Sequence, residues 1–128
     1  MISYNLSKTE TTSAVIDTFK KAFSKEPEVR PMVHTDRGAA YCSLAFNHYL
    51  EKMNYVHSMS HPGHPWENSP MERWWNDFKL LWLERHPQPQ SFEELKRLID
   101  EGVKYFNTKR AYASKNGLTA EKFRNQTA

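Results

Sequence analysis

Two short stretches decide the fold of this chain: Met32-Val33-His34-Thr35-Asp36-Arg37-Gly38 and Asn68-Ser69-Pro70-Met71-Glu72. The first is an apolar run that predicts a strand ending in a carboxylate, and Gly38 lets the chain turn sharply after it. The second predicts a helix start, with Ser69 as N-cap, Pro70 at the first helical position and Glu72 at the third. A strand end and a helix start on neighbouring elements can bring Asp36 and Glu72 together to share a divalent metal ion.

Each acid also has an ordinary structural explanation. Glu72 stands where a capping-box acid would accept a hydrogen bond from the Ser69 amide and favour the positive end of the helix. Asp36 precedes Gly38 by two residues, and Asp-x-Gly is common in turns. Two-metal sites usually need a third carboxylate, and no acid upstream of Asp36 lies in a strand-like context. The residues therefore point to a chemistry and leave open whether this chain performs it alone.

Working outward, the hydrophobic periodicity predicts an α/β layer. The expected elements are a strand over 2–6, a helix along 15–23, a strand over 32–34, a helix capped by Ser43 and a strand over 55–59. Strand, helix and strand in this order favour parallel pairing with a right-handed crossover. The sequence thus predicts a short parallel sheet flanked by helices.

The second half of the chain reads as helical. Pro62, Gly63 and Pro65 predict an irregular, mobile surface loop over 60–67. The helix after Ser69 should turn an apolar side inward, and we expect its tryptophans to be core rather than a base-stacking platform. Its expected inward residues are Met71, Trp74, Trp75, Phe78, Leu81 and Trp82. A capping box at Ser91 and Glu94 should start another helix that runs to Phe106, followed by a basic tail over 107–128 with a last helical turn after Thr119.

Length and composition fit one globular domain. The 128 residues are 38% hydrophobic with a net charge of +3, which allows a nucleic-acid partner without requiring one. Cys42 is the only cysteine, so a disulfide framework is excluded and a reducing compartment is favoured. We expect no signal peptide, no membrane span and a cytoplasmic location.

Several motifs together resemble a known family. They are His34-Thr35-Asp36-Arg37-Gly38-x-x-Tyr41, Ser58-Met59-Ser60-x-x-Gly63, Trp66-x-Asn68-x-Pro70-Met71-Glu72, Lys79, Tyr105-Phe106-Asn107-Thr108-Lys109-Arg110 and Gly117-Leu118-Thr119. In this order and spacing they resemble the second half of the DDE catalytic core of insertion-sequence transposases, in the retroviral-integrase superfamily. Ala120 departs from the proline that usually follows in that family.

The resemblance implies a truncated ribonuclease-H-like fold and metal-dependent phosphoryl transfer on DNA ends. Asp36 and Glu72 would be the second and third acids of the catalytic triad, holding Mg²⁺ or Mn²⁺. Residues 2–6 would correspond to the strand before the first helix, so the opening strands and the first Asp would be absent and the ions would bind weakly. Asp17 fits a solvated helix face better than that role.

Four residues are candidate DNA contacts. Lys79 lies seven residues beyond Glu72, about two helical turns along the same side, where its amine could hold a phosphate. The alternative is an ordinary exposed lysine on an amphipathic helix. Arg37, Arg110 and Asn68 are further candidates, and DNA affinity should fall with added salt.

The histidines invite a zinc reading through the spacing His57-x₃-His61-x₂-His64. We expect Pro62 and Gly63 to prevent a common helical face, and no cysteine completes a closed site. The sequence therefore favours an Mg²⁺ or Mn²⁺ site over a zinc site.

Three hypotheses about function remain open. The chain contributes to integration of transposon ends into DNA, with a separate polypeptide supplying the missing strands or as part of a longer product. It is an inactive remnant or regulator that binds DNA or full-length transposase. The third hypothesis is that the chain is an unrelated structural α/β domain, in which Asp36 and Glu72 serve only as capping residues. The exposed edge of a sheet without its central strands predicts a homodimer or association with another transposase chain.

Overall fold

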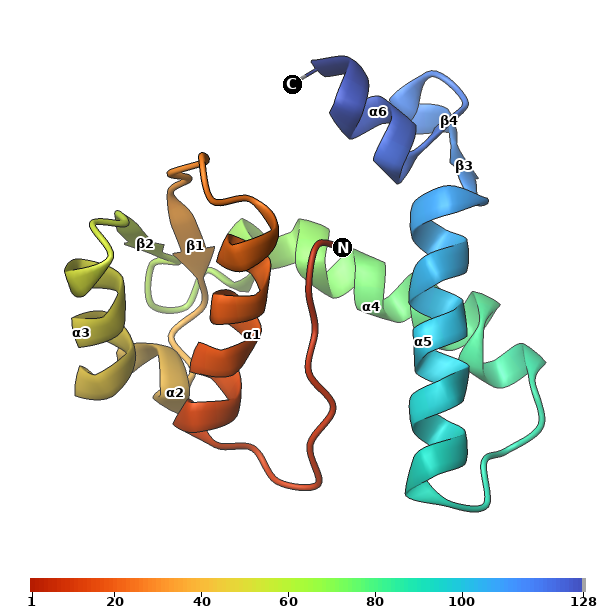
Figure 1. Ribbon diagram of the computed structural model, residues 1–128, viewed down its shortest axis with the longest axis horizontal. Coiled ribbons are helices and arrows are strands. Elements are labelled where there is room, and N and C mark those ends of the chain that lie inside the picture. The colour runs from red at the N-terminus through yellow and green to blue at the C-terminus, as the bar shows by residue number, and fades with distance from the viewer. Residues whose placement is uncertain (128) are drawn as a thin grey trace. The chain divides into compact units, whose positions relative to one another are not determined.

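The computed structural model of the chain describes residues 1–127 and divides into two compact units (Figure 1). The N-terminal unit comprises Ile2–Arg73, and the C-terminal unit comprises Met1 and the chain from Trp74 onward. Helix α4 (Ser69–Leu81) contributes residues to both units.

A two-stranded parallel sheet lies at the centre of the N-terminal unit. Strand β1 (Val33–Thr35) pairs with β2 (His57–Met59), with Val33 opposite His57 and Thr35 opposite Met59. Parallel strands need a helical crossover, and here it consists of α2 (Ala39–Cys42) and α3 (Leu44–Lys52). The predicted parallel pairing is confirmed.

Local capping explains where two helices of this unit begin. The Thr11 hydroxyl accepts a hydrogen bond from the Ala14 amide at the start of α1 (Thr12–Lys25). The Ser43 hydroxyl accepts one from the Phe46 amide at the start of α3. Each cap satisfies a backbone donor that has no partner inside its own helix. The predicted cap at Ser43 is confirmed.

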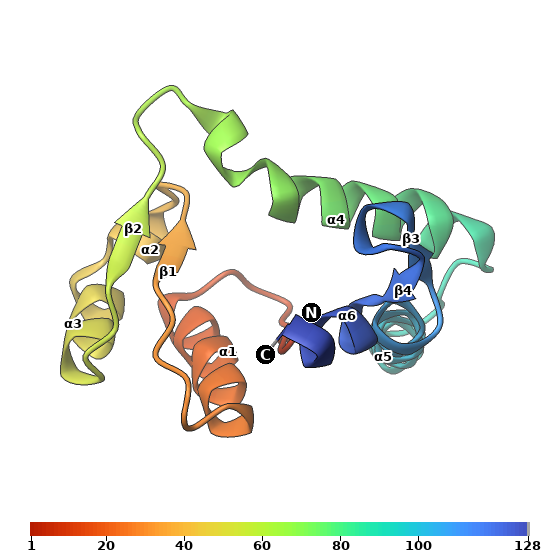
Figure 2. The ribbon, with the colours of Figure 1, turned by 90° about the horizontal axis from the view of Figure 1, so that it is seen from above.

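One aromatic cluster joins these helices to the sheet. Phe46 of α3 is fully buried, and its ring lies 5.3 Å from Phe19 of α1 and 5.3 Å from the His57 ring of β2. Val33 and Leu50 are buried with it. Aromatic burial on this scale supplies much of the stability of a small core. The two helices thus fix the position of β1 and β2, and with it the end of β1 that Asp36 follows (Figure 2).

The C-terminal unit is mainly helical. Its further elements are η2 (Leu83–Arg85), α5 (Phe92–Thr108), β3 (Ala111–Tyr112), η3 (Ala113–Lys115), β4 (Leu118–Thr119) and α6 (Ala120–Thr127). Phe78 of α4 and Phe106 of α5 are buried against each other, with ring centroids 5.3 Å apart. The Trp82 indole donates a 2.9 Å hydrogen bond to the Leu98 carbonyl, as a buried indole N–H requires.

The predicted cap at Ser91 is confirmed, because its hydroxyl accepts from the Glu94 amide. The Glu94 carboxylate accepts from the Gln90 amide instead of the Ser91 amide that a capping box would use. The helical turn predicted after Thr119 is present as α6, and the Thr119 hydroxyl accepts from the Lys122 amide at its start.

Several expectations are corrected. Residues 2–6 form no strand. The segment instead lies along α1, where the Ser3 hydroxyl donates to the Thr18 carbonyl and the Lys25 amine to the Ile2 carbonyl. Alternating apolar residues make a strand only when a neighbouring strand offers backbone partners. Besides the helical turn expected after Thr119, residues 107–127 hold an antiparallel β3–β4 pair that the sequence did not predict.

The expected inward side of α4 is also partly wrong, because Met71 and Trp75 are exposed, at 50% and 40%. The helices of residues 1–127 include none that is long and apolar enough to cross a membrane.

Candidate active site

Asp36 follows β1 directly and its side chain is exposed. Its Oδ1 accepts a 2.8 Å hydrogen bond from the Gly38 amide, which is an Asx-turn. Burial, and secondarily the Asp36 charge, raise the pKa of the nearby Tyr41 phenol. The turn explanation of Asp36 is therefore real, yet it uses only one carboxylate oxygen and leaves the residue accessible.

A polar chain anchors the strand end beside Asp36. The Asn47 amide group donates to the carbonyls of Tyr41 and Ser43, so its Oδ1 accepts from His57 Nδ1 at 2.8 Å. His57 Nε2 lies 2.8 Å from the hydroxyl of Thr35, which is itself buried. Burial, and then His34, lower the pKa of His57, which favours the neutral ring accepting from Thr35.

A second set of bonds ties the end of β1 to the end of β2. The buried Ser60 amide donates to the Thr35 carbonyl at 2.9 Å, and Arg37 Nε donates to the Ser60 carbonyl at 2.8 Å. The His34 ring bridges the hydroxyls of Ser58 and Ser60, at 3.0 and 3.2 Å. Asp36 thus projects from a backbone that is held on both sides.

Glu72 lies in the first turn of α4 and is exposed. The predicted cap at Ser69 is wrong, because the 3₁₀ helix η1 (Pro65–Asn68) runs directly into α4. Ser69 has helical dihedral angles, and its amide already donates to the Trp66 carbonyl. Within residues 1–127 the Glu72 carboxylate has no hydrogen bond or ion pair. The capping explanation of Glu72 therefore fails.

The two acids suit a hard divalent cation by their chemistry. Both carboxylates are exposed, and within residues 1–127 neither forms an ion pair with a lysine or arginine. Carboxylate oxygens are the ligands that Mg²⁺ and Mn²⁺ prefer. In the structure, Asp36 and Glu72 both belong to the N-terminal unit.

The four candidate DNA contacts lie in different settings. Lys79 is exposed in the last turn of α4, as a phosphate contact requires. Arg37 is exposed although its Nε holds Ser60. Asn68 is half-buried in η1. DNA contact by these residues stays a prediction.

Arg110 is committed to contacts within the protein. Its side chain is only 23% exposed, and Nη2 lies 3.4 Å from Asp77 Oδ2. The guanidinium stacks on Phe106 and Tyr112, 4.8 and 4.6 Å from the ring centroids. Nη1 is buried without a hydrogen-bond partner among residues 1–127. The DNA contact of Arg110 stays a prediction, and these contacts give it a structural role as well.

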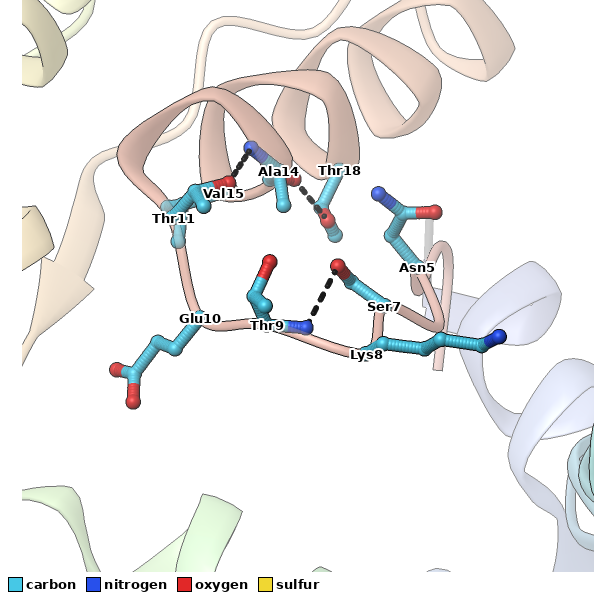
Figure 3. A pocket seen from close by; sticks show the side chains of 9 residues that line it. All are labelled: Asn5, Ser7, Lys8, Thr9, Glu10, Thr11, Ala14, Val15 and Thr18. Atoms are coloured by element: carbon cyan, nitrogen blue, oxygen red, sulfur yellow. Dashed lines mark hydrogen bonds between the residues drawn. The ribbon is translucent and has the colours of Figure 1, made fainter. Parts of the chain in front are cut away.

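A polar hollow of about 280 Å³ lies at the start of α1 (Figure 3). Its lining is Asn5, Ser7, Lys8, Thr9, Glu10, Thr11, Ala14, Val15 and Thr18. Neither Asp36 nor Glu72 contributes to it, so it is separate from the candidate active site.

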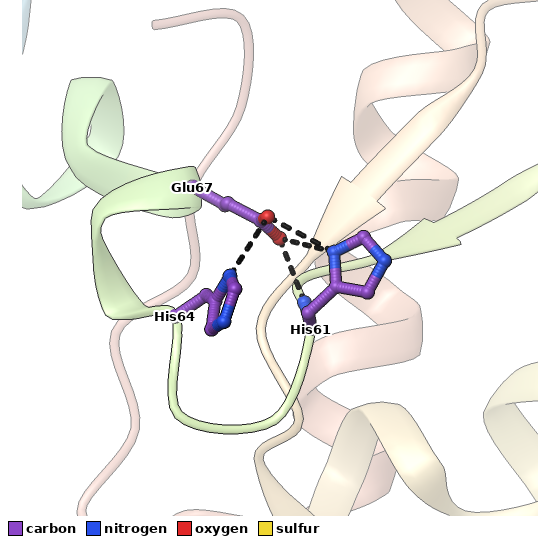
Figure 4. A group of neighbouring side chains, drawn as sticks. All are labelled: His61, His64 and Glu67. Carbon is purple, nitrogen blue, oxygen red and sulfur yellow. Dashed lines mark hydrogen bonds and ion pairs between the residues drawn. The ribbon is translucent and has the colours of Figure 1, made fainter.

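The structure brings His61 and His64 together with Glu67 (Figure 4). The two histidines share no helical face, as Pro62 and Gly63 predict, and a turn instead brings both rings to one carboxylate. His57 belongs instead to the polar chain with Asn47 and Thr35.

Sequence reasoning missed Glu67, and it missed the polar chain of Thr35, His57 and Asn47. The spacing of His61, His64 and Glu67, three residues each, is a signal that could have shown the first. Polar residues at the ends of buried strands, such as Thr35 and Ser60, are the only signal for the second.

Comparison with known proteins gives consistent matches along the chain. Residues 1–65 match the integrase core domain family, and residues 53–119 match a second family also described as integrase core domain. The chain is 29% identical over 130 residues to the putative transposase InsK for insertion sequence element IS150 of Escherichia coli K12. It is 29% identical over 117 residues to the transposase for insertion sequence element IS904 of Lactococcus lactis.

These matches cover 99% and 88% of this chain and 45% of each relative. The chain therefore spans about half the length of the transposases it matches.

Two solved structures share the fold. The HTLV-2 integrase catalytic core domain in complex with magnesium, in its dimeric form, superposes with a TM-score of 0.56 at 21% identity. It covers 91% of this chain and 72% of that one. The simian T-cell lymphotropic virus intasome, in complex with PP2A regulatory subunit B56 gamma, gives a TM-score of 0.69 at 23% identity, over 83% of this chain and 37% of that one.

The short parallel sheet with flanking helices is thus the ribonuclease-H-like fold of an integrase core. The chain belongs to the integrase core domain family, and it is similar to insertion-sequence transposases.

Proposed function

We propose that this chain is part of a transposase catalytic core that cuts and joins transposon ends during DNA integration. One observation carries the proposal. The two residues that match the family's acids, Asp36 and Glu72, are both exposed, and Glu72 has no capping role to explain it. Membership in the integrase core domain family supplies the reaction class.

Asp36 and Glu72 would hold Mg²⁺ or Mn²⁺. Such ions, when bound, activate the attacking hydroxyl group and stabilise the departing oxygen during phosphoryl transfer. The protein orients its own groups for this task. The Gly38 amide fixes one Asp36 oxygen, and the bond from Arg37 Nε to the Ser60 carbonyl holds the adjoining backbone. Lys79 would bind a DNA phosphate, so affinity would fall as salt is added.

A third carboxylate would complete the site from another polypeptide or from a further segment of a longer product. Two carboxylates alone hold a hard cation weakly, because affinity for such ions rises with the number of charged ligands. We therefore expect these 128 residues to bind the ion weakly, with a dissociation constant of about 10⁻⁴–10⁻³ M, as weak calcium sites do.

A second candidate is an inactive regulator that binds DNA or full-length transposase. One observation favours it: the four acids that precede Asp36 all lie outside strands. Asp17 is on α1, and Glu10, Glu26 and Glu28 are in connecting segments. None of them stands on a strand beside β1, as the family's first Asp would.

A nicking assay separates the two candidates. Labelled DNA carrying the element's terminal sequence is incubated with Mg²⁺ and the chain, alone and with the polypeptide encoded immediately upstream. Turnover that Asp36→Asn and Glu72→Gln each abolish, while Asp17→Asn does not, excludes the regulator.

Turnover that persists in both variants would contradict the assignment of the acids. No turnover in any mixture, combined with inhibition of full-length transposase, would support the regulator instead.

A further inference from the structure

We propose that His61, His64 and Glu67 form a zinc-binding site separate from Asp36 and Glu72. One ligand atom from each of the three residues lies within 4.8 Å of the other two (Figure 4). The inference does not rest on the proposed function, because it concerns different side chains and a different class of metal.

The local sequence builds this cluster in two steps. Residues 61–64 form a tight turn in which the His64 amide donates to the His61 carbonyl at 3.0 Å. Pro62 follows His61, and Gly63 has φ +75°, the residue pattern of a type II turn. The 3₁₀ helix η1 then begins, and its three residues per turn place Glu67 on the same side as His64.

The spacing of the donor atoms already approaches that of a tetrahedral site. Glu67 Oε1 lies 2.9 Å from His61 Nδ1 and 3.4 Å from His64 Nδ1. Zinc bonds of about 2.0–2.1 Å require neighbouring tetrahedral ligands to be about 3.3 Å apart. Only small side-chain movements would therefore admit an ion among the three groups.

A backbone hydrogen bond orients the Glu67 carboxylate. Glu67 Oε2 accepts a 2.7 Å hydrogen bond from the His61 amide. Partners of this kind fix the direction of a ligand and commonly strengthen metal binding. The His61 amide would keep its bond to Oε2 while Oε1 binds an ion, so the carboxylate can serve both partners at once.

The donor set selects the class of metal. Two imidazoles and one carboxylate suit Zn²⁺, whereas Mg²⁺ and Mn²⁺ prefer oxygen ligands. The His61 and His64 side chains are 74% and 46% exposed, so an ion can reach them from solvent. Three protein ligands leave a fourth position for water or for a group of another molecule.

A bound zinc ion would hold the segment between β2 and α4 in one conformation. That connection is the segment that leads to Glu72. The site would therefore set the start of α4 without itself supplying a ligand to the proposed Mg²⁺ or Mn²⁺ centre.

The test uses the tag-free chain with Zn²⁺ alone in calorimetry and Co²⁺ alone in visible absorption. We expect one zinc per chain and the absorption of tetrahedral cobalt. His61→Gln, His64→Gln or Glu67→Gln should each weaken binding by more than the roughly 10- to 100-fold typical of losing an outer-shell partner. Circular dichroism checks that each variant is folded, and removal of the exposed His61 or His64 ring should leave the spectrum unchanged.

Two controls make the result specific. His48→Gln removes an exposed histidine on α3 and should leave binding unchanged. Asp36→Asn combined with Glu72→Gln should also leave it unchanged, which separates this site from the proposed catalytic one. The proposal is overturned if the chain binds no zinc, if His64→Gln binds it as tightly as the parent chain, or if the Asp36 and Glu72 variant loses it.

Discussion

At the scale of single residues, the candidate active site depends on polar groups that support Asp36. Thr35 is 4% exposed, and its single hydroxyl hydrogen can go to the Asp36 carbonyl or to His57 Nε2, each 2.8 Å away. Asn47 fixes the tautomer of His57 through Nδ1. When His57 is neutral, its Nε2 carries no hydrogen and accepts from the Thr35 hydroxyl. When His57 is protonated, Nε2 donates to the Thr35 oxygen, and the hydroxyl hydrogen then points to the Asp36 carbonyl.

The protonation of His57 should make the stability of the fold depend on pH. Its pKa is lowered from 6.5 in the folded protein, so the unfolded chain binds the proton more readily. The neutral His57 ring therefore stabilises the fold fully above pH 6.5, the pKa of the unfolded chain. This stabilisation declines as the pH falls below 6.5 toward the lower pKa of the folded protein. His57→Gln should flatten the decline in urea unfolding free energy between pH 7.5 and 5.5.

The same substitution should cost about 1 kcal/mol at pH 7.5, since it removes the ring that packs on Phe46. His48→Gln, on an exposed face, serves as the control. An unchanged pH dependence in His57→Gln would show that His57 is not the titrating group.

Single residues also show how far sequence reasoning reaches. Asp36 could be placed at a strand end because the apolar run and Gly38 fix that position locally. The cap at Ser69 could not be rejected from sequence, because Ser-Pro-x-Glu is a normal helix start. Only the bond from the Ser69 amide to Trp66 shows that a helical segment already precedes it.

At the scale of elements, capped helices were the most predictable parts. Ser43 and Ser91 each accept the expected amide bond, since capping depends on residues within one turn. The strand over 2–6 failed because strand formation requires a distant partner. The helix η1 escaped prediction because proline commonly indicates a helix break, whereas it also suits the first turn of a helix, where Pro65 lies.

The packing of α5 on α4 yields a test at this scale. Gly102 is buried on α5, and a Cβ there would lie 2.5 Å from Trp82 Nε1 and 2.7 Å from Phe78 Cε2. Alanine gains about 1 kcal/mol of helix propensity over glycine. The clash, at about 1–3 kcal/mol, and the disturbed bond from Trp82 to Leu98 should outweigh this gain.

We therefore expect Gly102→Ala to lower the unfolding free energy in urea denaturation. Glu101→Ala, at the adjacent exposed position, should change it by less than about 0.5 kcal/mol. A more stable Gly102→Ala protein would contradict this packing.

At the scale of the whole molecule, the sheet has few strands. Within residues 1–127, β1 and β2 pair only with each other, so the outer edge of each strand has no strand partner. Such edges favour pairing with another chain. The single domain expected from length stays a proposal, because the contacts within the chain form two units.

We expect a dimer in solution. Multi-angle light scattering at high protein concentration should give twice the mass of one chain. A replacement of Val56, which is 60% exposed and precedes β2, by lysine should shift the equilibrium toward monomer if pairing uses that edge. A monomer at all concentrations would count against edge pairing.

The central claim is that Asp36 and Glu72 bind one divalent cation between them. Electron paramagnetic resonance of Mn²⁺ titrated into the chain measures this directly, and the zinc-site variant His64→Gln removes any contribution from that cluster. We predict weak binding of Mn²⁺ that Asp36→Asn and Glu72→Gln each abolish and that Asp17→Asn leaves intact. Equal Mn²⁺ binding by the parent chain and by both acid variants would contradict the claim.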